Sequence, residues 1–193
     1  MFNNFRIDLE QYFEGDYSPR RIFYAIFEMS LWAIAIFRFA KWAQRIPIFP
    51  IRFLFLLVYF FLYKFSEAFT GIRISAESEI GPGLVIHNFG GVLIKGNIGR
   101  NCVVVQGAQI VSRADGRGRG WPTLGDNVYV GSGAKILGGV TIGNRVRIGA
   151  NAVVMKDVPD DSVVMPPEPR IIKGFYRKRP DPSAAPRNPK ESS

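Results

Sequence analysis

The chain has 193 residues, of which 47% are hydrophobic, and this is enough for one main domain with a substantial core and some additional segments. Its formal net charge of +9 suits an anionic membrane surface or a phosphorylated ligand, whereas nucleic acid is disfavoured because the aromatic residues sit in long apolar runs. A single cysteine, Cys102, excludes an intrachain disulfide and a metal site built from several cysteines.

Residues 1–70 contain two apolar segments, which we expect to form helices. The first runs from Ile22 to Phe37 and includes Glu28, and the second runs from Phe53 to Tyr63, with residues 46–51 leading into it. A helix that spans a bilayer needs about 20 apolar residues, and neither segment supplies them without charged residues. The basic residues that flank the two segments are Arg20, Arg21, Arg38, Lys41, Arg45, Arg52 and Lys64.

Positive charge at both ends of each segment is unusual for a two-pass hairpin, because one end of each pass faces outside. It suits helices that lie in, or dip into, the cytoplasmic leaflet, so we predict a membrane-associated helical region. A buried helical pair at an oligomer interface is the alternative. Acidic residues, rather than a basic start, precede the first segment. We therefore expect no signal peptide, and a catalytic part at the cytoplasmic face of the inner membrane.

Residues 71–173 carry aliphatic side chains at every sixth position, in two series separated by an interruption. Neither the helical period of about 3.6 nor the alternation of a simple strand produces this spacing, which is typical of a parallel β-helix. Each hexapeptide supplies one short strand and a bend, and three of them make one triangular coil, so we expect about five coils. The repeat positions are Ile74, Ile80, Ile86, Val92, Ile98, Val104, Ile110, Leu124, Val130, Ile136, Ile142, Ile148 and Val154.

The bends between the strands require a left-handed backbone, which glycine and asparagine tolerate. We expect Asn101, Asn127, Asn144 and Asn151 to occupy such corners. The aliphatic side chain of each repeat should point into the prism and stack on its counterpart in the next coil, about 4.8 Å away. The coils are expected to be left-handed, against the usual right-handed crossover.

Two stretches depart from the repeat. Residues 111–122, VSRADGRGRGWP, insert a loop between two series that stay in register, and such loops often carry function. Residues 174–193 are basic and proline-rich without periodicity, so we expect a disordered tail. The predicted division is a helical region over 1–70, a β-helix over 71–173 and a tail over 174–193.

Three stretches carry a resemblance to a known family: GIRISAESEIGPGLVIHNFGGVLI, PTLGDNVYVGSGAKILGGVTIGNRVRIGANAVVMKDVP and PPEPRIIK. They resemble the hexapeptide-repeat acyltransferases, with similarity to serine acetyltransferase and more still to the polysaccharide or colanic acid biosynthesis O-acetyltransferases. The resemblance implies a mainly β fold, a left-handed β-helix, with acetyl-CoA as co-substrate and no metal. It also implies a homotrimer whose active sites lie between neighbouring prisms.

The resemblance makes His87, the only histidine, the general base that takes the proton of the acceptor hydroxyl. Asn88 is expected to orient His87 or the acceptor. Serine acetyltransferases have Asp-His here, whereas the polysaccharide type has a histidine at the position of His87. The acid that orients the histidine in serine acetyltransferase falls at Arg73, and the second active-site histidine falls at Trp121. These differences favour a sugar hydroxyl over serine, with Arg73, Arg113 and Trp121 contacting the acceptor.

Coenzyme A in this family runs along the prism, where small residues let the pantetheine arm approach backbone amides. The residues that match this zone are Gly131, Gly133, Ala134, Gly149 and Ala152. Basic residues near the C-terminal coils are expected to meet the phosphates, namely Lys135, Arg147, Lys156, Arg170 and Lys173.

We therefore predict an acetyl-CoA-dependent O-acetyltransferase that modifies a sugar hydroxyl, in a free or lipid-linked glycan, during exopolysaccharide or envelope biosynthesis. Two alternatives stay open: a serine O-acetyltransferase of cysteine biosynthesis, and a catalytically inactive trimeric membrane scaffold of the same fold. A zinc carbonic anhydrase on this fold needs three histidine ligands and is excluded, because the chain has one histidine.

Overall fold

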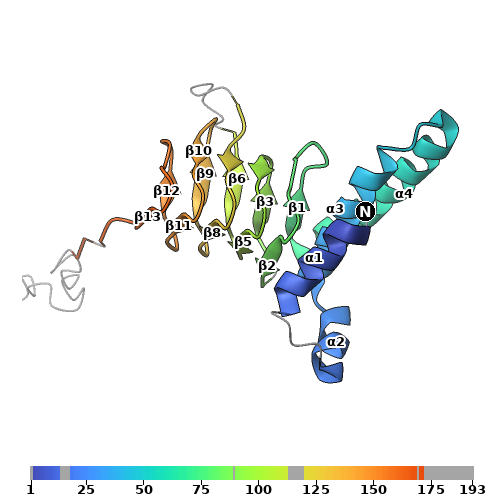
Figure 1. The fold of residues 1–193 in the computed structure, drawn as a ribbon, viewed down its shortest axis with the longest axis horizontal. Coiled ribbons are helices and arrows are strands. Elements are labelled where there is room, and N and C mark those ends of the chain that lie inside the picture. The colour runs from blue at the N-terminus through green and yellow to red at the C-terminus, as the bar shows by residue number, and fades with distance from the viewer. Residues whose placement is uncertain (1, 14–17, 89, 113–119, 169, 172–193) are drawn as a thin grey trace, which may run out of the picture.

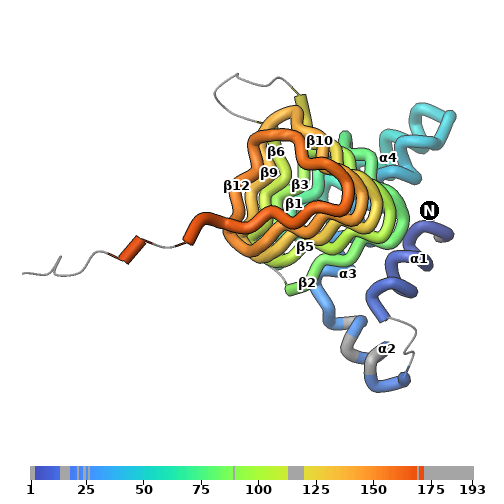
Figure 2. Tube along the Cα trace, turned by 60° about the vertical axis from the view of Figure 1, so that its left-hand side comes forward, coloured from blue at the N-terminus to red at the C-terminus, as the bar shows by residue number. Residues whose placement is uncertain are grey.

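The computed structural model describes residues 2–13, 18–88, 90–112, 120–168, 170 and 171. Helices occupy the N-terminal part, and a stack of short parallel strands follows them (Figure 1). Viewed obliquely along the stack, the chain winds in triangular coils laid one upon another (Figure 2). A parallel β-helix preceded by helices is therefore confirmed, while the predicted tail lies outside the described residues.

The described residues form four helices before the first strand: α1 Phe2–Phe13, α2 Pro19–Ile26, α3 Met29–Ala43 and α4 Phe49–Thr70. The predicted segment from Ile22 to Phe37 is wrong as a single helix, because the chain breaks between α2 and α3. Glu28 stands at the N-cap of α3 with an extended backbone, φ −75° and ψ 107°. Its carboxylate accepts a hydrogen bond from the Ser30 hydroxyl at 3.1 Å. The charged residue inside the apolar run thus marks a helix start.

Helix α4 is longer than the apolar segment from Phe53 to Tyr63. Pro50 lies in its first turn, where a backbone N–H has no helical partner in any case. The helix ends at Gly71, whose left-handed φ of 63° is the common way to close a helix. The sequence pattern does not predict α1, because acidic residues interrupt its apolar positions.

The strands form three parallel sheets, one on each face of the prism. Sheet A has the order β1-β3-β6-β9-β12, sheet B the order β10-β7-β4, and sheet C the order β13-β11-β8-β5-β2. The two five-stranded sheets agree with the coil number expected from the repeat. The strands are β1 Ile72–Ile74, β2 Val85–His87, β3 Val92–Ile94, β4 Asn97–Ile98, β5 Val103–Val105, β6 Gln109–Val111, β7 Thr123–Leu124, β8 Tyr129–Val130, β9 Lys135–Leu137, β10 Thr141–Ile142, β11 Arg147–Ile148, β12 Val153–Val154 and β13 Val163–Val164.

The core of the prism consists of the predicted repeat positions. All of them are buried, with at most 7% of the residue exposed. They stack in register along each face: in sheet C, Ile86 pairs with Val104, Val104 with Val130, and Val130 with Ile148. Burial of each such side chain is worth about 1.5–3 kcal/mol, so the column stabilises the prism along its whole length.

Most of the predicted corner residues adopt the left-handed backbone. Asn101, Asn127 and Asn151 have φ values of 52°, 58° and 60°. Asn144 was expected to do so and does not; the next residue, Arg145, takes φ 56° instead. The prediction failed there by one position, because the Asn144 side chain is used in a different way.

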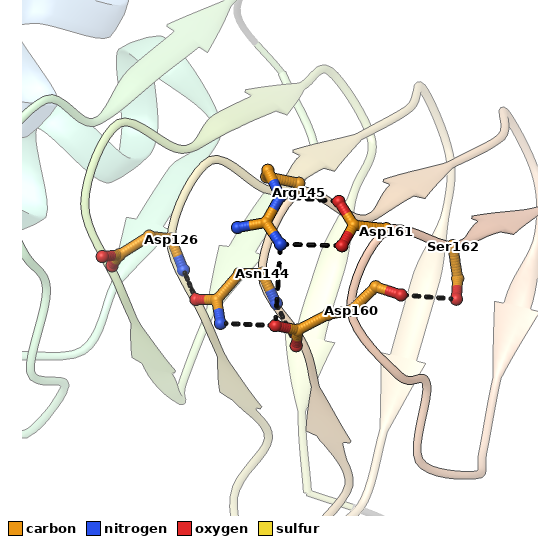
Figure 3. A network of polar contacts seen from close by, with 6 residues as sticks. All are labelled: Asp126, Asn144, Arg145, Asp160, Asp161 and Ser162. Carbon is orange, nitrogen blue, oxygen red and sulfur yellow. Dashed lines mark hydrogen bonds and ion pairs between the residues drawn. The ribbon is translucent and has the colours of Figure 1, made fainter.

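Side chains at the corner between sheets B and C form a ladder across three coils (Figure 3). The Asn144 Oδ1 accepts a hydrogen bond from the Asp126 N–H at 2.9 Å, and the Asn144 Nδ2 donates to the Asp160 Oδ2 at 3.0 Å. Arg145 donates from Nε and Nη2 to the two oxygens of Asp161, at 2.6 and 2.7 Å. Hydrogen bonds from Asn144 lower the pKa of Asp160, and those from Arg145 lower the pKa of Asp161.

A buried ion pair closes the N-terminal end of the prism. The Arg38 guanidinium donates from Nε and Nη2 to the Asp8 carboxylate, at 2.9 and 3.0 Å. The same guanidinium donates to the carbonyls of Ile80 and Gly81, at 2.7 and 2.6 Å. Only 4% of the Arg38 side chain and none of the Asp8 side chain is exposed. Two helices far apart in the sequence are thus joined to the first coil.

The Asp8 carboxylate also accepts hydrogen bonds from backbone N–H groups at the N-terminal end of the first coil. Its Oδ1 accepts hydrogen bonds from the backbone N–H groups of Gly83 and Leu84, at 2.7 and 2.9 Å. One coil higher, the corresponding N–H of Asn101 donates to the carbonyl of Pro82, which belongs to the coil beneath. The first coil has no coil beneath it, so Asp8 and Arg38 supply the partners that backbone groups supply elsewhere.

The helices and the prism share one hydrophobic core. Ile34 and Phe37 of α3 are 0% and 2% exposed and belong to the same buried cluster as Ile72 and Ile80 of the first coil. The division at residues 70 and 71, with a boundary of the β-helix at 173, stays a prediction.

Candidate active site

His87 is the last residue of β2 and points away from the core. Val85 and Ile86 are 3% and 1% exposed, whereas His87 is exposed, because the side chain that follows inward Ile86 in the strand points to the opposite face. Asn88 makes the turn that follows, with a left-handed φ of 60°. With the described residues, the His87 ring forms no hydrogen bond or ion pair. The ring is therefore available to a substrate or to a second protein chain.

His87 stands at the edge where sheet C passes into sheet A. We call this edge the glycine corner, and its described residues are 87, 88, 90, 91, 105–108, 131–134 and 149–152. A chain of backbone hydrogen bonds runs along it. The Gln106 N–H donates to the His87 carbonyl at 3.1 Å, the Gly133 N–H to the Gln106 carbonyl at 2.9 Å, and the Asn151 N–H to the Ser132 carbonyl at 2.8 Å.

Glycine is required along this edge by both conformation and space. Gly91, Gly107 and Gly133 have left-handed φ values of 69°, 74° and 68°. A Cβ on Gly107 would lie 3.4 Å from the Gly133 nitrogen, and one on Gly133 would collide with the Asn151 side chain. The result is a strip of bare backbone beside His87, on which a thin, flexible chain can lie.

The structure brings the predicted small residues to the glycine corner. Gly131, Gly133 and Ala134 lie in one coil, and Gly149 and Ala152 lie in the next. Ala134 and Ala152 are 0% and 1% exposed, so their side chains belong to the core and only their backbone can face a ligand. Sequence position alone does not separate these inward residues from the outward ones.

The predicted basic residues do not form a single cluster. Lys135 in sheet A and Arg147 in sheet C are both exposed, and each is close in sequence to the glycine corner. Lys156 follows β12 at the opposite end of that strand, and exposed Arg170 lies beyond β13. Lys173 lies outside the described residues. Lys135 and Arg147 therefore flank the corner, and Lys156 does not.

Arg73 is engaged by α4. Its Nε lies 3.0 Å from the Glu67 Oε1 and donates to the Tyr63 hydroxyl at 3.2 Å. The Tyr63 hydrogen bond, followed by the Glu67 charge, raises the pKa of Arg73. Arg73 belongs to β1 in sheet A, whereas His87 belongs to sheet C. Within one chain, Arg73 does not take the place of an acid beside the His87 ring.

Trp121 stands at a different edge of the prism from His87. It precedes β7 of sheet B, it is 37% exposed, and the Lys95 ammonium lies 4.9 Å from its ring centroid. Arg113 lies outside the described residues. Because one chain keeps Trp121 and His87 on separate edges, a site that uses both would take Trp121 from another copy.

The chain is similar to known proteins in its hexapeptide repeats and over most of its length. The family model for bacterial transferase hexapeptide (six repeats) matches residues 122–156. A serine acetyltransferase of Synechococcus elongatus is 34% identical over 181 residues, which are 89% of this chain and 69% of the relative. The chain belongs to the hexapeptide-repeat acyltransferases and is serine acetyltransferase-like.

Other members of the family extend the comparison. A serine acetyltransferase of Staphylococcus aureus is 39% identical over 112 residues, which are 57% of this chain and 53% of the relative. The structure of Neisseria gonorrhoeae serine acetyltransferase in complex with serine has a TM-score of 0.67 and 25% identity, covering 83% of this chain and 64% of that chain. The chain thus spans 69% of one curated relative and 53% of the other.

The family likeness supports a left-handed β-helix and an acetyl-CoA-dependent O-acetyltransferase with acetyl-CoA as co-substrate. The fold of these acyltransferases is typically trimeric. In the part of the chain that the structure describes, no group of three or more His, Cys, Asp and Glu side chains is placed to hold a metal ion.

The predicted main function, acetylation of a glycan hydroxyl in exopolysaccharide or envelope biosynthesis, is wrong. The relatives at 34% and 39% identity are named serine acetyltransferase, and so is the solved neighbour. The same comparisons do not support the polysaccharide subtype or a sugar or lipid-linked glycan as acceptor. The prediction relied on Arg73, Asn88, Trp121 and the apolar helices. These few features count for less than similarity over most of the chain.

Cys102 is buried and poorly suited to act as a nucleophile. It is 0% exposed, and its thiol lies 3.3 Å from the Gly125 carbonyl oxygen, within hydrogen-bonding distance. Burial raises its pKa to about 11, so the reactive thiolate is scarce at neutral pH. A covalent acyl-cysteine is therefore disfavoured, and direct transfer to the acceptor is favoured.

One residue near the candidate site escaped the sequence reasoning. Gly71, the C-cap of α4, packs on the turn that follows His87: a Cβ on it would lie 3.2 Å from both the Gly90 Cα and the Gly91 nitrogen. The signal that could have found it is a glycine directly after a long apolar run, which is a common helix stop. It shows that α4 abuts the His87 turn.

Proposed function

We propose that this chain is a serine acetyltransferase-type enzyme, which transfers the acetyl group of acetyl-CoA to the hydroxyl of serine. The observation that carries the proposal is an exposed histidine at the end of β2, beside a strip of bare backbone, in a chain that is serine acetyltransferase-like. The solved neighbour described in complex with serine supports this acceptor.

His87 acts as general base in the proposed reaction. Its unprotonated ring nitrogen takes the proton from the serine hydroxyl while the oxygen attacks the carbonyl carbon of the thioester. The carbon–sulfur bond then breaks, and the coenzyme A thiolate takes the proton back from the imidazolium. Asn88 serves mainly to turn the chain directly after His87, with a left-handed φ of 60°.

Acetyl-CoA lies along the glycine corner in this proposal. The left-handed glycines at 91, 107 and 133 leave room for the pantetheine arm next to the His87 ring. Lys135 and Arg147, exposed on the two flanking faces, supply positive charge for the phosphates.

A neighbouring prism completes the site. The His87 ring has no polar partner among the described residues, and Trp121, where the family has its second active-site histidine, stands on another edge. A trimer brings one edge of each prism to its neighbour, so Trp121 comes from a second copy. Arg73 and Arg113 stay predicted acceptor contacts.

The direct test is release of the free thiol of coenzyme A from acetyl-CoA in the presence of L-serine. We expect serine-dependent turnover in the wild type, and a loss of about 10²- to 10⁴-fold in kcat in His87→Ala, with little change in acetyl-CoA binding. Thr141→Ala is the matched control, because Thr141 is exposed in sheet B, away from the glycine corner.

Each alternative has its own outcome. Unchanged turnover in His87→Ala would contradict the assignment of His87 as the general base. Acetyl-CoA binding without turnover on serine would contradict serine as acceptor. Absence of both binding and turnover would contradict the enzyme and leave the non-catalytic scaffold.

A further inference from the structure

Helix α4 exposes a large apolar surface. Among the described residues it is the one helix long and apolar enough to cross a membrane by length and composition, and only 6% of its most apolar stretch is buried. Its exposed large apolar side chains, here called the α4 outer face, are Phe49, Ile51, Phe53, Leu54, Leu57, Val58, Phe60, Phe61, Leu62, Phe65 and Phe69. A surface of this kind on a soluble protein marks a contact with a partner or a membrane.

One stripe of α4 is covered, and it faces α3. The Phe55 ring lies 6.0 Å from the Phe39 ring and 5.1 Å from the Trp42 ring, between centroids. The exposed residues lie on the other side of the helix: successive residues turn by about 100°, so Leu57, Val58, Phe60 and Phe61 project within an arc of about 160°. One broad apolar side is what a helix that lies in the surface of a lipid leaflet presents.

Basic residues predominate around the α4 outer face, and the acidic residue of α4, Glu67, is paired with Lys64 and Arg73. No acidic residue occurs between Glu28 and Glu67. Arg45, which follows α3, and Arg52, in α4, form no ion pair with any described residue, and the Arg52 guanidinium lies 5.7 Å from the Phe49 ring centroid. Cations beside exposed aromatic rings suit an anionic lipid surface. A second copy would bring like charges together.

The C-terminal end of α4 is held to the first coil. Gly71 leads directly from α4 into β1, whose Ile72 is 2% exposed. In α3, on which α4 packs, the Lys41 ammonium lies 2.7 Å from the Glu79 carboxylate of the same coil. A helix that is fixed in this way beside the end of the prism can lie in the plane of one leaflet.

We propose that the α4 outer face docks this protein on an anionic lipid bilayer, with α4 lying in the plane of the leaflet surface. The apolar side chains enter the boundary between headgroups and acyl chains, and Arg45 and Arg52 meet the lipid phosphates. The prism then stands on the membrane by its N-terminal end, where α1 and α3 close it. In this proposal, the protein lies at the membrane face on which anionic lipid is exposed.

Co-sedimentation of the full chain with lipid vesicles tests the proposal. Wild type is mixed with vesicles of phosphatidylcholine alone, or of phosphatidylcholine with phosphatidylglycerol, and the bound fraction is measured at rising salt. We expect tighter binding to the anionic vesicles, weakened by salt. Leu57→Glu with Phe61→Glu should lose at least about tenfold in binding, since two charges enter the apolar boundary. Arg45→Gln with Arg52→Gln should lose about fivefold for each cation removed.

The matched control adds the same charges on the prism. Val153→Glu with Val163→Glu changes two apolar residues that are 53% and 64% exposed, in sheets A and C. Vesicle binding should stay at the wild-type level there, with unfolding curves of all variants confirming the fold. If the double variant Leu57→Glu with Phe61→Glu bound the anionic vesicles as tightly as wild type, the proposal would be overturned. A second result would also overturn it. If wild type did not bind vesicles but self-associated with rising concentration, and the double variant did not self-associate, the α4 outer face would be an interface with a second copy.

Discussion

The prism and the helical region distribute polar and apolar side chains in opposite ways. In the prism, every repeat position from Ile74 to Val154 is buried, and basic residues such as Lys135 and Arg147 stand outside. In the helical region, the ion pair of Asp8 and Arg38 is buried while α4 exposes a row of phenylalanine and leucine side chains. The prism is organised around its own axis. The helical region packs on the first coil on one side and exposes the apolar α4 outer face on the other.

The largest expected effect comes from opening the buried ion pair. Asp8→Ala leaves the Arg38 charge buried without its partner and orphans two N–H groups of the first coil. We expect a loss of about 3–5 kcal/mol in the free energy of unfolding, measured by denaturant titration. Lys41→Ala is the control, because the Glu79 carboxylate of that pair is mostly exposed, and it should cost no more than about 1 kcal/mol. If the two substitutions lowered the free energy of unfolding equally, the role of the Asp8–Arg38 pair in closing the first coil would be contradicted.

A second comparison sets a buried aliphatic residue against an exposed one. Ile136→Ala removes a side chain that is 0% exposed in the middle of the prism, and it should cost about 2–5 kcal/mol. Leu57→Ala removes one that is 44% exposed on the α4 outer face, and it should change stability by less than about 0.5 kcal/mol in lipid-free buffer. Thermal unfolding of both variants measures the contrast. A large loss in Leu57→Ala would show that the face is covered in solution.

The smallest expected effect concerns acid stability at the corner ladder. The pKa values of Asp160 and Asp161 lie below the ordinary 3.8, because their charged forms accept hydrogen bonds from Asn144 and Arg145. Their contribution to stability is therefore present above pH 3.8 and is lost as pH falls through the lowered values. Both carboxylates are exposed, so the effect is small. Melting temperatures of wild type and Asp161→Asn should converge in acid; a constant difference would contradict the linkage.

The prism could be predicted in detail because its information is local and periodic. A six-residue spacing fixes which side chains point inward, and the register follows once Ile86, Val104 and Val130 are stacked. The predictions failed at residues whose side chains form contacts that the repeat pattern does not encode. Asn144 bonds to the neighbouring coils and leaves the left-handed turn to Arg145, and Glu28 caps a helix within an apolar run.

The helical region was harder to read because its decisive contacts are distant in sequence. Asp8 meets Arg38 and the N–H groups of residues 83 and 84, and no spacing rule connects these positions. At the candidate site, His87 and the glycines beside it could be found from the sequence. The acceptor was misjudged, because single positions such as Arg73 and Trp121 were treated as decisive, while the structure shows one bound to α4 and the other on a separate edge.

The cap of Asp8 and Arg38 has a consequence for aggregation. A β-helix ends in open strand edges, and an open edge can recruit the last coil of another molecule and grow into a fibre. At this end, the carbonyls of Ile80 and Gly81 and the N–H groups of Gly83 and Leu84 are already occupied by buried side chains. A foreign strand would have to displace a buried charge pair to dock there. The cap thus limits the molecule to its own coils and closes this end to polymerisation.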